Sequence, residues 1–281
     1  MKYKLLVVGA SGFVGRHLSR FLADNQEIDL ILTSRKERKG MLRINDYDDI
    51  PFVDLVIHLG GSNATHGDNL KLLSALPFDL ENSRKILRRC ERAIYVSSAY
   101  VYKDNGETPI NIFSALESRL PYSCYKQKME SIFLESNRAI VVRPSNLYGN
   151  GMSERSLMMG ILRQVEALSS LKVKNCSPVR DYLHVKDFVN GISLLGEIYL
   201  ERNLHDRVFN FGTGVGTSVR ELCTMISLMV GFKDEIECLS HHKHIPSYLV
   251  LEAGRTSEET RWFPSLSLGT GLEAVINLNQ R

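Results

Sequence analysis

The sequence lacks cysteines at the paired spacings of disulfide scaffolds and zinc sites. The 281-residue chain contains five cysteines, an odd number, and no two of them stand in a Cys-x-x-Cys spacing. Disulfide scaffolds and zinc sites both depend on paired cysteines at short, regular spacings. We therefore expect neither a disulfide framework nor a bound metal, and a reducing cytoplasmic location fits best.

Long apolar runs and an excess of one charge are also missing. No apolar run approaches the roughly 18 residues of a membrane-spanning helix, and a strand-like segment begins at Lys4, where a leader would need its apolar stretch. The 35 basic and 32 acidic residues are interspersed and give a formal net charge of +3. Because no basic tail and no mixture of aromatic and basic residues is present, we expect neither a nucleic-acid partner nor a membrane partner.

Apolar, strand-like runs alternate with segments of helical periodicity in the first half of the chain. The expected strands cover residues 4–8, 29–33, 53–58, 93–97 and 139–143, and the expected helices cover residues 14–25, 69–90 and 122–135. Strands joined by helices form a parallel sheet covered on both faces, with ligands at the carboxyl ends of the strands. The expected fold class is therefore α/β, with a Rossmann-type doubly wound parallel sheet.

The alternation changes in two places. Only 19 residues, 34–52, separate the second and third of these strands, so a further strand near 41–44 leaves little room for a crossover helix. Beyond Tyr148, helices dominate and short strands such as 208–211 intervene. We expect residues 1–148 to form the cofactor-binding core with the catalytic residues, and residues 149–281 to form mainly a small C-terminal substrate-binding region, with elements that return to the core.

A glycine-rich turn follows the first strand. Gly9, Gly12 and Gly15 are spaced as G-x-x-G-x-x-G between the expected strand and helix, so the backbone can turn tightly and approach a pyrophosphate at the positive helix end. The expected cofactor residues in this turn are Gly9, Ser11, Gly12, Phe13, Val14 and Gly15. The alternative is a glycine turn that packs the helix and binds nothing.

The end of the second strand carries basic residues where NAD-binding proteins carry a carboxylate for the ribose hydroxyl. Ser34 and Arg35 stand at this position, and Lys36, Arg38 and Lys39 follow. Guanidinium groups suit the 2′-phosphate of NADP, so NADP is predicted in preference to NAD, with Ser34, Arg35, Arg38 and Leu59 among its contacts. The alternative is a solvated basic loop.

Two Tyr-x-x-x-Lys pairs are present, Tyr122 with Lys126 and Tyr182 with Lys186. One helical turn brings such a pair together, and the ammonium group can lower the pKa of the phenol for general acid–base catalysis. The position in the chain favours Tyr122 as the catalytic tyrosine, because its helix follows a strand that ends at Ser98. We predict Tyr122 as proton donor or acceptor, Lys126 as its pKa modifier and a ribose ligand, and Ser98 as a hydrogen-bond partner of the reacting oxygen. The alternative for Ser98 is a turn serine.

These segments together resemble the extended short-chain dehydrogenase/reductase family, which includes nucleotide-sugar epimerases, dehydratases and reductases. The matching segments are GASGFVG (9–15), VDLVIHLGG (53–61), AIYVSSAYVY (93–102), YSCYKQKME (122–130), VVRPSNLYGNG (141–151), RDYLHVKD (180–187) and FNFGTG (209–214). They occur in family order across most of the chain. The resemblance implies an NAD(P)-dependent enzyme whose substrate is a sugar on a nucleotide diphosphate.

The resemblance also implies roles for individual residues. Asn146 matches an asparagine that contacts the nucleotide sugar, and Arg180 matches an arginine on the diphosphate, although an ion pair with Asp181 or Asp187 is an alternative for Arg180. Arg255 is a further candidate phosphate ligand. Members of the family are often dimers through a helix pair that includes the Tyr122 helix, so a homodimer is expected.

The residues after Ser98 narrow the choice among the reactions of this family. Dehydratases of the family carry Asp and Glu after the catalytic hydroxyl, whereas Ala99 and Tyr100 stand here, so dehydration is disfavoured. The leading hypothesis is NADPH-dependent reduction of a nucleotide-linked keto-sugar, a 4-keto-6-deoxyhexose in deoxysugar or polysaccharide biosynthesis. The alternatives are a 4-epimerase and a non-catalytic NADP-binding regulator. The histidines at 241–244 lack ligand spacing, and His58 is expected to be a hydrogen-bonded core residue.

Overall fold

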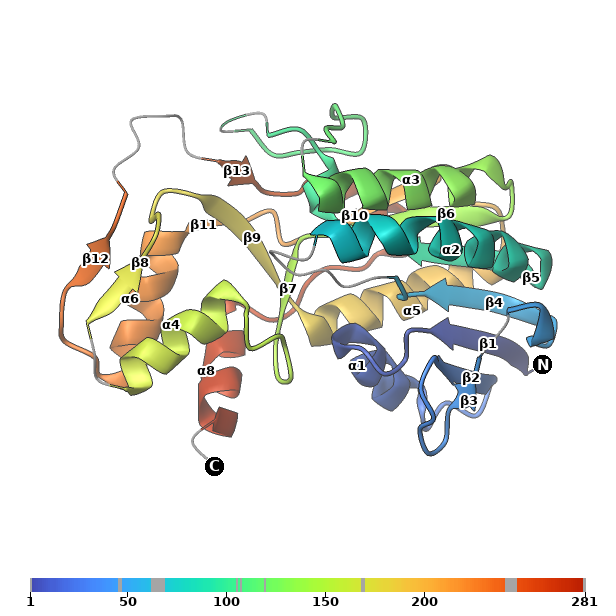
Figure 1. Ribbon diagram of the computed structural model, residues 1–281, viewed down its shortest axis with the longest axis horizontal. Helices are drawn as coiled ribbons and strands as arrows, with labels where there is room; N and C mark the ends of the chain where they lie inside the picture. Colours follow the sequence, from blue (N-terminus) through green and yellow to red (C-terminus); the bar gives the residue numbers. More distant parts are fainter. Residues whose placement is uncertain are drawn as a thin grey trace.

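The protein is described by a computed structural model that covers residues 2–44, 47–61, 69–104, 106, 108–118, 120–167, 170–240 and 247–279. Its centre is a parallel sheet of seven strands in the order β10-β6-β5-β4-β1-β2-β3 (Figure 1). The strands are β1 (Tyr3–Val8), β2 (Ile28–Ser34), β3 (Leu42–Arg43), β4 (Val53–His58), β5 (Cys90–Val96), β6 (Ala139–Pro144) and β10 (Val208–Phe211). The predicted fold class is confirmed.

Helices cover both faces of this sheet (Figure 1). Helices α1 (Phe13–Leu22) and α5 (Val185–Glu201) pack together on one face, and α2 (Asn69–Arg88) and α3 (Pro121–Glu135) pack together on the other. The residues of β1 are apolar throughout because the strand is buried on both sides. Alternate residues pack into the hydrophobic clusters on opposite faces of the sheet.

The short segment between β2 and β4 is accommodated by a minimal edge strand. β3 pairs in parallel with the end of β2, and a single 3₁₀ turn, η1 (Tyr47–Asp49), lies between β3 and β4. The strand predicted near residues 41–44 is therefore confirmed. Because the described residues between β2 and β4 form no long helix, the end of β2 and the η1 turn can border a ligand pocket.

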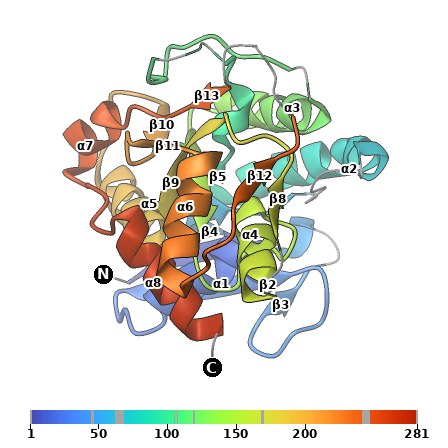
Figure 2. The same cartoon turned by 90° about the vertical axis from the view of Figure 1, so that its left-hand side faces the viewer.

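The second half of the chain adds smaller sheets and a separate hydrophobic cluster. Its further elements are β7 (Asn146–Tyr148), α4 (Leu157–Glu166), β8 (Leu171–Val173), β9 (Val179–His184), β11 (Gly216–Ser218), α6 (Val219–Val230), β12 (Ile236–Cys238), β13 (Tyr248–Leu249), α7 (Gly254–Thr260) and α8 (Leu268–Asn279). Helices α4, α6 and α8 stand together in Figure 2 and share the cluster that includes Leu162, Leu222 and Leu272. In contrast, α5 and β10 belong to the central sheet and its cover.

One disulfide contradicts the expectation from cysteine spacing. Cys176 and Cys238 are bonded, with Cα atoms 5.8 Å apart and a sequence separation of 62. The pairing arises because β8 and β12 lie side by side in parallel, which brings Cys238 opposite Val173, three residues before Cys176. The prediction of no disulfide was therefore wrong, because a strand pairing over this sequence separation leaves no local signal.

Within the described ranges, we find no helix that combines the length and the apolar character needed to cross a membrane.

Candidate active site

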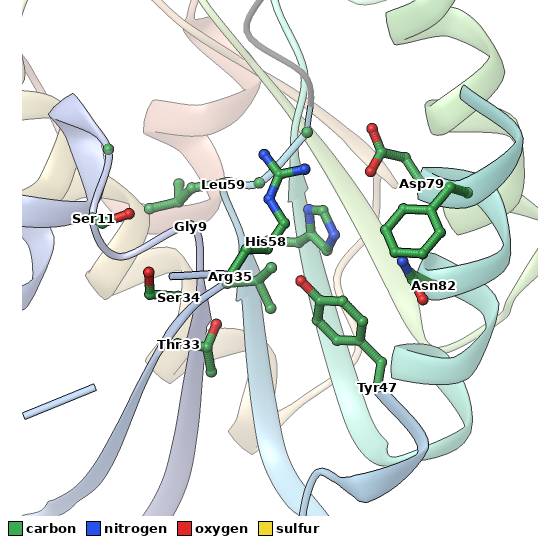
Figure 3. A pocket seen from close by; sticks show the side chains of 15 residues that line it. Gly9, Ser11, Thr33, Ser34, Arg35, Tyr47, His58, Leu59, Asp79 and Asn82 are labelled. Carbon is green, nitrogen blue, oxygen red and sulfur yellow. The ribbon is translucent and has the colours of Figure 1, made fainter. Parts of the chain in front are cut away.

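A pocket of about 130 Å³ opens at the carboxyl ends of β1, β2 and β4. Its lining combines the glycine turn after β1, the ends of β2 and β4, the η1 turn and one face of α2 (Figure 3). The lining residues are Val8, Gly9, Ser11, Gly12, Thr33, Ser34, Arg35, Tyr47, His58, Leu59, Gly60, Gly61, Phe78, Asp79 and Asn82. This is the edge of the sheet at which the sequence predicts a ligand.

The glycine turn has the geometry of an anion cradle. Gly9 has a φ of +83°, and a Cβ atom there would lie 2.9 Å from the backbone nitrogen of Gly60. Gly12 caps α1, whose first turn contains no acidic residue, so the N–H groups that lack partners at a helix start are available to a phosphate. Among the predicted residues, Gly9, Ser11 and Gly12 line the pocket, whereas residues 13–15 form the first turn of α1 behind it.

The end of β2 contributes a positive charge to the pocket, carried by Arg35. Ser34 is buried and accepts a hydrogen bond from the backbone N–H of Lys36 at 3.2 Å, while the exposed Arg35 directs its guanidinium into the space in front of the glycine turn (Figure 3). Both residues line the pocket, as does Leu59. Arg38 is exposed and is not among the lining residues.

The opposite wall comes from residues that the sequence analysis missed. Tyr47 on η1 and Asp79 and Asn82 on α2 face Arg35 across the pocket (Figure 3). Asp79 accepts a hydrogen bond from the Tyr125 hydroxyl at 2.5 Å, which ties α2 to α3 at this wall. No motif marks these residues, because they meet only when the α2 helix packs on the sheet.

Ser98, Tyr122 and Lys126 are brought together beyond the end of β5. Ser98 follows β5, caps the 3₁₀ turn η2 (Ala99–Val101) by accepting from the N–H of Tyr100 at 3.2 Å, and hydrogen bonds with the Tyr122 side chain. Tyr122 stands in the first turn of α3, and Lys126 follows one turn later. Ser98 is therefore both a turn serine, the alternative reading of this residue, and a partner of Tyr122, the predicted catalytic tyrosine. By contrast, Tyr182 lies in β9 and Lys186 in α5, so that pair shares no helix.

The electrostatics differ from the expected lowering of the Tyr122 pKa. Burial raises the pKa of the Tyr122 phenol to about 12, although the hydrogen bond with Ser98 lowers it. The Lys126 ammonium donates to the carbonyl of Val96 at 3.0 Å and lies 5.9 Å from the centre of the Tyr122 ring. Burial lowers the pKa of Lys126 to about 8, opposed by the charges of Glu130 and Asp79. The predicted lowering of the Tyr122 pKa is not seen in this arrangement, because burial of the phenol has the largest effect on that pKa.

The predicted substrate residues fall in two places. Asn146 on β7 lies opposite Tyr182 of β9, and Arg180 stands two residues earlier on β9. The Arg180 guanidinium donates to the carbonyl and the hydroxyl of Ser247 at 2.9 and 3.0 Å. The structure therefore groups Asn146 and Arg180 on adjoining strands.

The alternative partners of Arg180 are engaged elsewhere. Asp181 accepts from the backbone of Thr213 at 2.9 Å, and Asp187 accepts from the backbone of Leu266 at the same distance. Arg255 lies on α7, 3.9 Å from Asp206 and 3.7 Å from Glu258, and is not among the pocket-lining residues. Its role as a phosphate ligand stays a prediction.

Two histidine expectations have different outcomes. His58 is 5% exposed, as expected for a core residue, but its Nδ1 atom has no hydrogen-bond partner within the described part of the chain. The expectation of a hydrogen-bonded core histidine was therefore wrong for this atom, because His58 stands at a strand end where the sheet opens into the pocket. The histidines at 241–244 lie outside the described residues.

Comparisons with known proteins agree on one family. The family model described as NAD dependent epimerase/dehydratase family matches residues 5–212. GDP-6-deoxy-D-mannose reductase of Pseudomonas aeruginosa is 25% identical over 300 residues, which cover 99% of this chain and 97% of that protein. UDP-glucose 4-epimerase of Azospirillum brasilense is 24% identical over 304 residues, which cover 93% of this chain and 87% of that protein.

A solved structure also shares the fold. RMD from Pseudomonas aeruginosa, complexed with NADPH, superposes with a TM-score of 0.81 at 24% identity, and the match covers 98% of each chain.

Proposed function

Because the chain belongs to the NAD-dependent epimerase/dehydratase family, we propose that it uses NADPH to reduce a keto-sugar carried by a nucleotide diphosphate. A 4-keto-6-deoxyhexose, as used in deoxysugar or polysaccharide biosynthesis, is the proposed sugar. The observation that carries this proposal is the contact of Ser98 with Tyr122 at the carboxyl end of β5, one helical turn from Lys126. The similarity to a GDP-6-deoxy-D-mannose reductase over 99% of the chain supports it.

The proposed cofactor residues fit an anionic dinucleotide. Gly9, Ser11 and Gly12 would hold the pyrophosphate at the start of α1, and Arg35 would pair with the 2′-phosphate. We propose NADPH over NADH because the end of β2 carries this arginine and no carboxylate. When bound, the nicotinamide supplies the hydride that reduces the carbonyl carbon.

The chain's own residues would supply the proton that the carbonyl oxygen takes up. Tyr122 donates its phenolic proton to the carbonyl oxygen, and Ser98 hydrogen bonds with the same oxygen. A phenol with a pKa of about 12 holds its proton until negative charge develops on the substrate oxygen, as a general acid requires. The Lys126 ammonium then stabilises the resulting phenolate.

The substrate would bind beside these residues on the second half of the chain. We propose that Asn146 contacts the sugar and that Arg180 binds the diphosphate, since β7 and β9 place them on adjoining strands. Residues 149–281 would then serve mainly the substrate, and residues 1–148 the cofactor. The exposed Leu70 and Leu73 on α2, beside α3, support a homodimer through this helix pair, which sedimentation velocity would test.

The test is a stoichiometric assay with NADPH and a series of nucleotide-linked 4-keto-6-deoxyhexoses. Reduction predicts loss of one NADPH for each sugar consumed. The second candidate, a 4-epimerase, has support from the similarity to UDP-glucose 4-epimerase and predicts an inverted sugar with no net loss of cofactor. A Tyr122→Phe protein with full biological effect would instead indicate a non-catalytic regulator.

A further inference from the structure

One arginine of α1 connects the glycine turn to the turn that follows β7. The Arg16 guanidinium donates to the carbonyl of Ser11 at 2.9 Å and to the carbonyl of Gly151 at 3.2 Å. Ser11 lines the proposed cofactor pocket, whereas Gly151 stands 135 residues after Arg16 and belongs to the second half of the chain. One side chain therefore contacts the backbone of both proposed binding regions, where the turn after β7 lies beside α1 (Figure 1).

His17 holds the same turn at the neighbouring residue. Its Nε2 atom lies 2.8 Å from the carbonyl of Asn150, and because a carbonyl only accepts hydrogen bonds, this nitrogen is the donor. The His17 ring packs edge-on against Phe13, with ring centres 5.4 Å apart. Phe13 in turn packs against both the cluster of the central sheet and the cluster of α4, α6 and α8. Polar and apolar contacts thus join the start of α1 to the second half of the chain.

The turn formed by residues 149–151 continues β7, the strand of the proposed sugar contact. Asn146 is the first residue of β7, and Gly149 follows its last residue. Gly149 has a φ of +143°, and a Cβ atom there would lie 2.7 Å from the side chain of Val185 on α5. Because the turn is packed this closely against α5, its position and the position of β7 are linked.

The shared guanidinium connects the order of one turn to the order of the other. Arg16 is exposed, so packing alone does not hold its long side chain, which loses rotamer freedom when it is fixed. A phosphate bound to the N–H groups at the start of α1 restrains the glycine turn, including the Ser11 carbonyl. A restrained Ser11 carbonyl orders Arg16, and the bond to Gly151 then costs less conformational entropy.

We propose that Arg16 and His17 are positioning residues that couple the two halves of the active site. A dinucleotide on the glycine turn strengthens binding of the nucleotide sugar at β7, and the sugar strengthens binding of the dinucleotide by the same factor. This inference rests on the proposed cofactor and substrate sites. Neither residue contacts the reacting atoms, because both act through the backbone of the two turns.

The first test is hydrogen–deuterium exchange of the full chain with NADP⁺ alone, without turnover. The N–H of Met152 donates to the carbonyl of Gly149 at 3.1 Å, so a peptide that includes Met152 reports on the turn. Saturating NADP⁺ is expected to slow exchange in this peptide about tenfold in the wild type, and to have no such effect in Arg16→Met. A wild-type peptide that exchanges equally fast with and without bound NADP⁺ would overturn the proposal.

The second test measures the coupling as a ratio of affinities. GDP, UDP and dTDP are titrated calorimetrically into the full chain, with and without saturating NADP⁺. For the diphosphate that binds, Kd is expected to be about tenfold lower with NADP⁺ in the wild type, and equal under both conditions in Arg16→Met. Arg16→Lys retains the charge but lacks the planar fork that serves two carbonyls. Its ratio should also fall towards one, which excludes a simple effect of charge.

His17 offers a matched pair of variants. His17→Phe retains the ring beside Phe13 and removes the donor, whereas His17→Gln retains a donor. The ratio should fall in His17→Phe and stay close to the wild-type value in His17→Gln. Arg20→Met is the control, at an exposed position one turn after Arg16 on the same helix. Equal losses in Arg20→Met would show a general effect on α1 and would count against the coupling.

The outcomes separate this inference from the proposed function. A wild type that reduces a keto-sugar with NADPH but shows an affinity ratio of one would refute the coupling and leave the reduction intact. If NADP⁺ or all three diphosphates failed to bind, the proposed sites would fail, and the coupling with them.

Discussion

Arg143 and Glu130 form a buried ion pair behind the proposed active site, with two hydrogen bonds of 2.9 and 2.6 Å. Glu130 lies on α3, one helical turn after Lys126, and Arg143 lies on β6. Their side chains are only 3% and 4% exposed. The pair therefore fixes the helix that carries Tyr122 and Lys126 against the central sheet.

Removing one partner of this pair should destabilise the protein strongly. Arg143→Met leaves the Glu130 carboxylate buried without its partner, and such losses cost about 3–5 kcal/mol. Denaturant unfolding of the full chain would measure this. The double variant Glu130→Leu with Arg143→Met should recover much of the loss, and a double variant as unstable as the single one would contradict the role assigned to the pair.

The buried Lys126 should make stability depend on pH in the alkaline range. Its pKa is about 8 in the folded protein against an ordinary value of 10.5, so between these values the unfolded chain binds the additional proton. The free energy of unfolding contributed by Lys126 therefore rises as pH rises from about 8 to about 10.5. The free energy of unfolding should be measured against pH for the wild type and for Lys126→Met. This rise should appear when the Lys126→Met curve is subtracted from the wild-type curve. Lys128→Met, at an exposed position of the same helix, should retain the wild-type curve.

Arg35 should determine the preference for NADPH. Loss of a guanidinium that pairs with a phosphate costs about 1.5–3 kcal/mol, so Arg35→Ala should raise KM for NADPH about 10- to 100-fold. KM for NADH should change little, because NADH lacks the 2′-phosphate. Arg38→Ala is the control outside the pocket lining. Equal effects of the two variants would mean that the basic loop acts only by its overall charge.

The Cys176–Cys238 bond should stabilise the second half of the chain. A disulfide across 62 residues contributes about 2–4 kcal/mol by restricting the unfolded chain. Cys238→Ser should lower the free energy of unfolding by that amount, as should a dithiol reductant with the wild type. Cys124→Ser, at a free and partly exposed cysteine, should have no such effect. A wild type that a reductant leaves unchanged would refute the prediction.

The central sheet could be predicted from the sequence because its signals are local. A strand such as β4 is one apolar run, and both of its faces are buried, so its composition alone indicates its place. The glycine turn and Ser98 could be predicted for a related reason, since each follows directly from the end of a strand.

The remainder of the site depends on packing between distant segments. Asp79 and Asn82 reach the pocket only because α2 lies against the sheet, and Cys176 meets Cys238 only because β8 pairs with β12. The pKa of Tyr122 depends on how deeply the phenol is buried, which a Tyr-x-x-x-Lys spacing does not specify. His58 was placed in the core correctly, but its unpaired nitrogen depends on neighbours that only the fold supplies.

The return of α5 and β10 to the central sheet limits how this chain can be divided. A fragment that ends at Tyr148 would lack β10, leaving the edge of β6 without its neighbouring strand. It would also lack the apolar face of α5, including Phe188 and Ile192, which covers one side of the sheet. The two halves of the chain are thus expected to fold as one unit, and neither is expected to be stable when expressed without the other.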